Sequence, residues 1–340
     1  MNDNTPTATD LVPSTDTGST GIPHLKRLWG KLEQTITAGK TNNNEAELDT
    51  ALLNVLGLGL LPTYEFFFHQ HPSLQVFEQW VMGFYPNGVP DEKIKECYAL
   101  LEQNIHADAS NATDVLSEND LAFWEEHGYV IVQNAISQED CLAARQAIWD
   151  YLNMKEDDPA TWYNNDNQLQ GIMVPLYRHW AIDQNRNASR IKKAFEQVWN
   201  QAGLIVTTDK CGFNAPETAM AKYKGIGLHW DVSLATPIPF GTQGILYLTD
   251  TAANQGALTV VPGFHKTIEN WLQSLPPGAN PRETDFSVFK PVSIAANAGD
   301  LIIWDHRLPH SSSPNRANLP RLVQYINWYS PLQKSQGVWI

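Results

Sequence analysis

Residues 299–328 read GDLIIWDHRLPHSSSPNRANLPRLVQYINW. The stretch contains two apolar runs, residues 301–304 and 322–328, which are typical of buried β-strands and are separated by polar turn residues. His310 follows the first run, and Arg321 stands at the head of the second. The pattern therefore predicts a β core that carries two polar side chains at the ends of its strands.

The segments around this stretch extend the same core. Further candidate strands lie at residues 219–224, 244–249, 257–261 and 292–295, separated by Gly, Pro and Asn turns. Helices are expected earlier in the chain, where Ser117 and Ser137 stand as caps before apolar periodic runs and residues 188–201 show helical spacing. Helices first and many strands afterwards predict an all-β core with helices on one face, an α+β domain over residues 113–340.

The part of the chain before this domain has a different pattern. Residues 23–112 show apolar side chains at three- and four-residue steps, which predicts an N-terminal helical region of about four helices. Their apolar faces must pack on each other, on the rest of the chain or on another subunit, so homo-oligomerisation through this region is one expectation. Residues 1–22 are polar and lack the pattern of a secretory signal, and we interpret them as a disordered tail.

Composition excludes several classes of partner. The formal charge of −14 over 340 residues repels nucleic acid and anionic membranes, and no run of Lys and Arg offsets it. No apolar run approaches the roughly 18 to 20 residues that span a bilayer. The three cysteines are far apart and form no C-x-x-C pair, so they predict reduced thiols and a cytoplasmic protein.

The sequence HWD at residues 229–231 is the strongest indication of chemistry. In an extended strand, residues two apart point to the same face, so His229 and Asp231 can bind one metal ion together. A distant histidine would complete the site, and two imidazoles with one carboxylate are the ligand set of non-haem iron(II) oxygenases. We assign that position to His310 rather than His306, because the Ser-rich turn and the distance to Arg321 fit His310.

Arg321 is the second indication. An arginine that points into a β core is costly unless it meets an anion, and its guanidinium suits a carboxylate through two parallel hydrogen bonds. Arg321 is therefore the candidate for binding the distal carboxylate of an oxoacid. Arg316 is the rival, but it lies among Pro and Asn residues of a loop, where a solvated role is expected.

Four ordered blocks with these spacings resemble the phytanoyl-CoA dioxygenase family. The blocks are FWEEHGYVI at residues 123–131, HWD at 229–231, GALTVVPGFHK at 256–266 and GDLIIWDHRLPH at 299–310. The resemblance covers residues 116–340, and the helical region before it has no counterpart. It implies a double-stranded β-helix, the jelly roll of cupin-like proteins, with iron(II), 2-oxoglutarate and O2 as cofactor and cosubstrates.

The resemblance also implies roles for individual residues. His229, Asp231 and His310 match the iron ligands, and Arg321 matches the arginine that binds 2-oxoglutarate. Ser312 matches a polar contact to the cosubstrate. A further aromatic contact to the cosubstrate is expected at Tyr247. The implied activity is a dioxygenase that hydroxylates or otherwise oxidises a C–H bond of a small organic molecule and releases succinate and CO2.

Two alternative functions stay open. A non-redox cupin-like metal protein, an isomerase or a ligand-binding module, would need the metal site but no oxoacid, and Arg321 and Ser312 argue against it. A scaffold without activity is disfavoured by the intact ligand set. Several aromatic and basic side chains precede the first core strands and are candidates for a lid over the iron, namely Trp162, Tyr163, Tyr177, Arg178 and Trp180.

Overall fold

Helices and strands separate into two units along the chain. The computed structural model describes residues 11–39, 45–103, 113–163, 169–334 and 336–340. Contacts divide it into a helical unit, residues 1–106 with 331–333, and a β unit, residues 107–330 with 334–340. The sequence boundary placed between residues 112 and 113 lies close to this division, although residues 104–112 are outside the described ranges.

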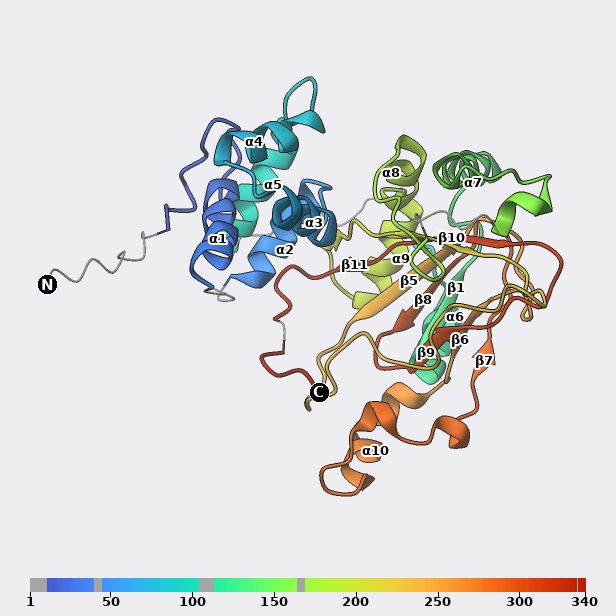
Figure 1. Ribbon diagram of the computed structural model, residues 1–340. Coiled ribbons are helices and arrows are strands. Elements are labelled where there is room, and N and C mark those ends of the chain that lie inside the picture. Colours follow the sequence, from blue (N-terminus) through green and yellow to red (C-terminus); the bar gives the residue numbers. More distant parts are fainter. Residues whose placement is uncertain (1–10, 40–44, 104–112, 164–168, 335) are drawn as a thin grey trace, which may run out of the picture. The chain divides into compact units, whose positions relative to one another are not determined.

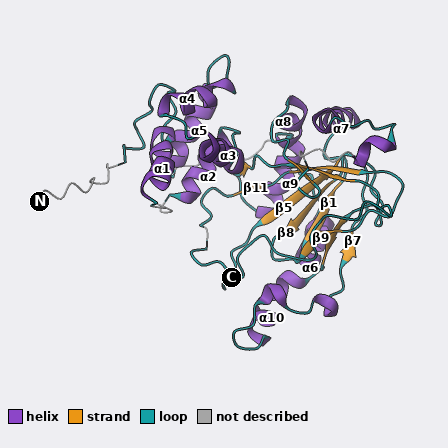
Figure 2. Cartoon of the chain, viewed as in Figure 1, coloured by secondary structure: helices purple, strands orange, loops and turns teal. Residues whose placement is uncertain are grey.

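The described part of the helical unit contains α-helices and no strand, as Figure 2 shows. Its five helices are α1 (Leu25–Ala38), α2 (Ala46–Val55), α3 (Leu60–Gln70), α4 (Leu74–Gly83) and α5 (Asp91–Leu101). Leu25 and Leu28 of α1, Phe67 of α3 and Phe77 of α4 are fully buried. The apolar side chains at helical spacing thus form a core within this unit.

The expectation of a disordered tail over residues 1–22 is wrong for residues 11–22, and residues 1–10 lie outside the described ranges. Ile22 is fully buried, and the hydroxyl of Ser14 lies 2.9 Å from Nδ1 of His24. Nε2 of His24 in turn lies 2.9 Å from the carboxylate of Asp49 on α2. A polar network therefore attaches this segment to the helices, and its polar composition hid that role.

Three antiparallel sheets form the β unit. The six-stranded sheet has the order β1-β8-β5-β10-β4-β2, the three-stranded sheet β7-β6-β9, and the small sheet β11-β3. Their bounds are β1 Tyr129–Val132, β2 Met173–Val174, β3 Ile205–Val206, β4 Cys211–Asn214, β5 Thr242–Tyr247, β6 Leu258–Val260, β7 Val292–Ser293, β8 Leu301–Asp305, β9 His310–Ser312, β10 Arg321–Tyr325 and β11 Trp328–Tyr329.

The six-stranded sheet is buried on both faces, which explains why its strands read as continuous apolar runs. Along β8, Leu301 and Ile303 join the core shared with the helices, whereas Ile302 and Trp304 join the core shared with the three-stranded sheet. Figure 1 shows α7, α8 and α9 on one side of β5, β8 and β1. The side chains of alternate residues therefore separate a helix-covered face from an inner face that holds the polar groups.

The helices of the β unit begin and end where their capping residues stand. Ser117 and Asp120 form a reciprocal capping box at α6, and Gly128 ends that helix with φ 76°. The α-helices are α6 Glu118–His127, α7 Gln138–Leu152, α8 Trp180–Arg186, α9 Ser189–Trp199 and α10 Ile268–Ser274. Short 3-10 helices are η1 Pro159–Tyr163, η2 Phe264–Lys266, η3 Pro281–Glu283 and η4 Phe286–Val288.

One expected strand does not form. Residues 219–224 contain no strand, because their backbone groups bond locally: the amide of Ala221 donates to Oγ1 of Thr218 at 2.9 Å, and that of Tyr223 donates to Glu217 at 3.1 Å. The other expected strands correspond to β5, β6, β7, β8, and β10 with β11. Their observed bounds differ by a few residues at the ends.

Strand β4 was not expected, because its sequence, CGFN, carries no strand signal. Its Gly212 lies opposite Val323 of β10, and an added Cβ would lie 2.8 Å from a Val323 methyl and 3.3 Å from the ring of Tyr325. The absence of a side chain at this position leaves room for the large side chains of β10. Packing against β10 thus requires glycine at position 212, although glycine has a low propensity for β-strands.

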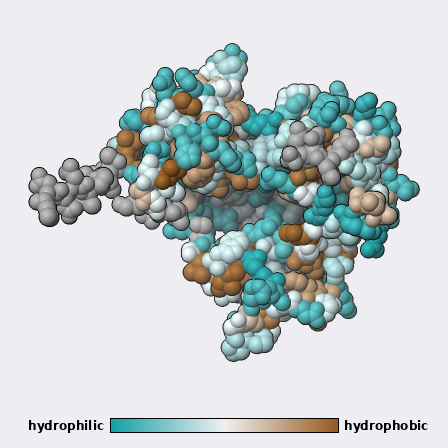
Figure 3. All heavy atoms as spheres, in the orientation of Figure 1, coloured by the Kyte–Doolittle hydropathy of each residue, from teal (hydrophilic) through white to brown (hydrophobic). Residues whose placement is uncertain are grey.

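The described surface mixes polar and apolar side chains, as the visible face in Figure 3 shows. Among the described residues, no single helix combines the length and the apolar composition of a membrane span, although the bent pair α2 and α3 meets both criteria jointly.

Burial of β8 on both faces predicts that a substitution on this strand destabilises the β unit more than one on the exposed strand β7. Ile303→Ala should lower the free energy of unfolding of the β unit by about 2 to 5 kcal/mol, because Ile303 is fully buried and a cavity replaces its side chain. Val292→Ala on β7 is the control, and since Val292 is 46% exposed its effect should stay within about 0.5 kcal/mol. Urea denaturation followed by tryptophan fluorescence measures both, and equal effects would contradict the layer arrangement.

Candidate metal centre

His229 and His310 are held side by side by the backbone. The amide of His229 donates to the carbonyl of His310 at 3.0 Å, and the amide of His310 donates to the carbonyl of His229 at 3.0 Å. This isolated antiparallel bridge links the loop of residues 229–231 to the start of β9. The sequence placed His229 and Asp231 in an extended strand, but only His229 pairs with a neighbour, and Asp231 lies in the loop that follows.

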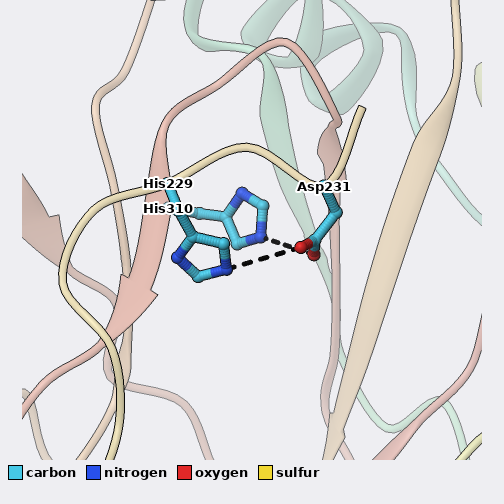
Figure 4. A group of neighbouring side chains, drawn as sticks. All are labelled: His229, Asp231 and His310. Atoms are coloured by element: carbon cyan, nitrogen blue, oxygen red, sulfur yellow. Dashed lines mark hydrogen bonds and ion pairs between the residues drawn. The ribbon is translucent and has the colours of Figure 1, made fainter. Parts of the chain in front are cut away.

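The three polar side chains converge on one point. Nε2 of His310 lies 3.2 Å from one carboxylate oxygen of Asp231, and Nε2 of His229 lies 3.6 Å from the other. One donor atom from each residue fits within 4.8 Å of the other two, a separation that one metal ion can bridge. Figure 4 shows the two imidazoles directed toward the carboxylate.

The orientation of both imidazoles suits metal binding. Nδ1 of His229 lies 2.8 Å from the carbonyl of Gly227, and Nδ1 of His310 lies 3.1 Å from the carbonyl of Leu308. A carbonyl only accepts, so each Nδ1 carries a proton, and Nε2 is the ring nitrogen that remains for a metal. Outer hydrogen bonds of this kind fix the tautomer of metal-binding histidines.

Electrostatics favour the metal-binding protonation states of Asp231 and His229. Burial would raise the pKa of Asp231, but the hydrogen bonds from His310 and Gln243 and the nearby histidines hold it well below its usual range. Burial and the neighbouring His310 lower the pKa of His229. Asp231 is therefore an anion and His229 a neutral imidazole at pH 7.

Gln243 on β5 is a contact that the sequence did not indicate. Its amide nitrogen donates to Asp231 at 2.8 Å, and its amide oxygen accepts from the indole of Trp304 at 3.1 Å. The chain from Trp304 through Gln243 orients the Asp231 carboxylate. Two imidazoles and one carboxylate fit a divalent first-row metal and leave coordination positions open.

Arg321 is fully buried on β10 without a carboxylate partner. Its Nη1 donates to the hydroxyl of Ser312 at 3.0 Å, but its Nε and Nη2 form no hydrogen bond of ordinary geometry with the described residues. No ion pair to Arg321 occurs among the residues that the structure describes. A buried cation with unused donors is costly, so these donors suit an incoming anion.

The hydroxyl of Tyr247, the residue expected to contact the cosubstrate, bonds to the backbone. Its hydroxyl donates to the carbonyl of Ile294 at 3.0 Å and accepts from the amide of Leu258 at 2.8 Å. A phenol has a single proton to donate, so this one is not available to a carboxylate. The spacing that pointed to Tyr247 could not reveal that its side chain ends at the backbone between β6 and β7.

Two other tyrosines lie where Tyr247 was expected. Tyr223 and Tyr325 line the cavity that contains the candidate ligands, and both interact electrostatically with Arg321. The hydroxyl of Tyr223 donates to the carbonyl of Ser312 at 2.5 Å. Tyr325 follows Arg321 by four residues on β10 and thus shares its face, a signal that the sequence did contain.

The cavity has a volume of about 470 Å³ and combines polar and apolar walls. His229, Asp231, His310 and Ser312 line it. Asp209 also lines it, and burial raises the pKa of that carboxyl group. A small organic molecule fits this space.

The alternative ligands from the sequence lie elsewhere. Nε2 of His306 lies 2.7 Å from the carbonyl of Pro239, and His306 is not part of the three-residue cluster. The side chain of Arg316 is 74% exposed and lies 3.9 Å from Glu217. The geometry therefore favours His310 over His306 and Arg321 over Arg316.

The expected lid residues are dispersed. Trp162 and Tyr163 line a second cavity of about 380 Å³, which shares Tyr223 and Lys224 with the first. Trp180 is 65% exposed on α8. Tyr177 and Arg178 line neither of these two cavities.

Comparisons with known proteins identify similar sequences and structures. The family model described as phytanoyl-CoA dioxygenase (PhyH) matches residues 124–323. A Dictyostelium discoideum protein named as a phytanoyl-CoA dioxygenase is 24% identical over 259 residues, which cover 61% of this chain and 74% of that protein.

Solved structures show a more distant likeness. AviO1 from Streptomyces viridochromogenes is 16% identical with a TM-score of 0.48, covering 66% of this chain and all of that chain. EctD from S. alaskensis, solved with 2-oxoglutarate and 5-hydroxyectoine, is 15% identical with a TM-score of 0.45, covering 66% and 80% of the two chains.

The geometry predicts which histidines matter for metal binding. His229→Ala and His310→Ala should each abolish binding of one equivalent of divalent metal, because two remaining donors hold a labile ion poorly. His306→Ala is the control and should bind metal as the parent does, since His306 bonds to a backbone carbonyl. Elemental analysis after anaerobic loading and desalting gives the stoichiometry, and full metal content in either ligand variant would remove the assignment.

Proposed function

The chain belongs to the phytanoyl-CoA dioxygenase family, and we propose on this premise that it oxidises a C–H bond of a small organic molecule with iron(II), 2-oxoglutarate and O2. Succinate and CO2 are the other products. His229, Asp231 and His310 are the proposed iron ligands. Bound iron with 2-oxoglutarate supplies the activation of O2, and the protein supplies geometry and a protected cavity.

The observation that carries this proposal is the unmatched charge of Arg321. A metal site alone serves many proteins, but a fully buried guanidinium with unused donors, bonded to a serine that lines the same cavity, calls for an anion. The distal carboxylate of 2-oxoglutarate is such an anion, and the hydroxyl of Ser312 stands next to the same guanidinium. Tyr325 takes the place of Tyr247 as the proposed aromatic contact.

The residues of this chain then have distinct tasks. Arg321 and Ser312 orient the oxoacid, while Gln243 and the carbonyls of Gly227 and Leu308 keep the three ligands in position. The apolar walls of the cavity exclude water from the reacting groups. The fold proposed for this arrangement is the double-stranded β-helix expected from the sequence.

A non-redox cupin-like metal protein remains the alternative from another class. It would bind the metal through the same three residues and would not consume 2-oxoglutarate. The unused donors of Arg321 favour the oxygenase. The direct test is anaerobic loading with iron(II) and 2-oxoglutarate, followed by exposure to O2 and measurement of succinate, and metal binding without any succinate release would favour the alternative.

The binding partners and the cellular location of the protein are predicted from its sequence. We propose a small-molecule substrate rather than nucleic acid or membrane, since the charge of −14 opposes polyanions. A cytoplasmic location and homo-oligomerisation through the helical region stay predictions from the sequence.

Substitution of Arg321 separates the oxygenase from its non-redox rival. Arg321→Leu keeps bulk in the core but removes a charge-assisted contact whose loss costs on the order of 2 to 5 kcal/mol. The KM for 2-oxoglutarate should rise by roughly thirty-fold or more, at about 1.4 kcal/mol per factor of ten, while metal affinity changes little. Succinate release at varied 2-oxoglutarate measures the KM.

Arg316→Leu is the matched control, because this arginine is close in sequence but largely exposed. It should leave the KM for 2-oxoglutarate within about a factor of two. A damaging Arg316→Leu together with a neutral Arg321→Leu would overturn the proposed position of the cosubstrate.

A further inference from the structure

We propose that Arg282 is a positioning residue for Asp231, holding the backbone on both sides of this ligand from outside the cavity. The inference rests on the proposed metal site. Nη1 of Arg282 donates to the carbonyl of Trp230 at 2.7 Å, and Nη2 donates to the carbonyl of Val232 at 2.6 Å. One planar guanidinium thus bridges the carbonyl groups of the two residues that flank Asp231.

Asp231 needs such support because the sheet does not provide it. His229 has its backbone bridge to His310, whereas residues 230–235 form no strand. The Asp231 side chain is 54% exposed, and its hydrogen bond to Gln243 orients the carboxylate but not the backbone. A ligand on an unsupported loop would lose affinity because metal binding would have to order that loop.

The remaining contacts of Arg282 restrain the guanidinium itself. Its Nε donates to the carbonyl of Ile340 at 3.0 Å, and its Cζ lies 5.1 Å from the centre of the Trp339 ring. Residues 338–340 are in turn bound to the ligand loop, since the hydroxyl of Ser233 donates to the carbonyl of Val338 at 2.7 Å. No ion pair to Arg282 occurs among the described residues, so its donors serve the backbone.

The segment that carries Arg282 also supports the side chain of Trp230, which stands between the two ligands. Trp230 is 2% exposed and its ring centre lies 5.5 Å from that of Trp271 and 5.7 Å from that of Phe286. Its indole donates to the carbonyl of Arg307 at 2.9 Å. Residues 264–289, which carry α10, η3 and η4, therefore hold the ligand loop through an aromatic cluster and through Arg282.

Ni(II) titration by calorimetry tests the inference, because Ni(II) binds nitrogen donors more tightly than Fe(II) and needs no anaerobic handling. Arg282→Met should weaken Ni(II) binding by about 10- to 100-fold, the usual effect of removing an outer-shell partner. Arg190→Met is the matched control, since Arg190 also donates to a backbone carbonyl but on an exposed surface. It should leave Ni(II) affinity unchanged.

A double-mutant cycle with Asp231→Ala distinguishes positioning from general damage. In Asp231→Ala the two histidines bind Ni(II) only weakly, so this comparison is made with Ni(II) in large excess. If Arg282 acts through Asp231, then Arg282→Met should weaken this residual binding by less than about three-fold. An equal loss in both backgrounds would overturn the inference, as would unchanged affinity in Arg282→Met alone.

Arg282→Lys is the second variant and keeps the fold testable if the Met variant does not fold. Lys keeps the charge but, as a point donor, cannot bridge both carbonyls, so its Ni(II) affinity should also fall. Parental affinity in the Lys variant would contradict the bridge. Failure of the parent itself to bind Ni(II) would instead reject the proposed metal site, so the two failures are distinguishable.

Discussion

Two backbone hydrogen bonds between His229 and His310 are the constraint on which the site depends. They join residues 81 positions apart into one bridge, and they bring two imidazoles to ring centres 4.6 Å apart. Neighbouring elements support this bridge. Strand β9 pairs with β6, and the side chains on the inner face of the six-stranded sheet form a core with the three-stranded sheet. The carboxylate of Asp231 then needs only a short loop to reach both imidazoles.

The second constraint is electrostatic. Burial of Arg321 without a carboxylate opposes folding, and the hydroxyl of Ser312 satisfies only one of its donors. The cavity is lined by the Asp231 carboxylate, by two imidazoles, and by Ser312, whose hydroxyl bonds to the buried guanidinium of Arg321. A bifunctional ligand with a metal-binding end and an anionic end is complementary to the metal ligands and to this guanidinium.

Sequence patterns predicted the structure well where the type of a residue and its spacing from other residues indicated the same feature. The capping residues Ser117 and Ser137, the apolar run of β8 and the cluster of His229, Asp231 and His310 all follow from such patterns. The family is confirmed by the family model that matches residues 124–323. The buried position of Arg321 was also predictable, because an arginine at the head of an apolar strand is carried into the core with that strand.

The features without a sequence signal depend on contacts between distant segments. Gly212 weakens a strand locally, yet β10 requires it, and the tether of His24 to Ser14 and Asp49 is invisible in a polar terminus. The spacing that pointed to Tyr247 does not show which groups its hydroxyl bonds to. Arg282 lies in the segment of residues 264–289, which shares no motif with the ligands. It bonds to backbone carbonyl groups, and because every residue has one, the sequence gives no sign of this contact.

The aromatic cluster around Trp230 has a consequence for how such a protein can change. The rings of this cluster anchor the ligand loop but do not line the cavity, so the cavity walls outside the Trp304–Gln243 chain do not have to hold the ligands. Mutations there can alter the shape of the pocket while the metal-binding geometry is preserved. A scaffold that separates its anchorage from its recognition surface in this way is well suited to acquire new substrates during evolution.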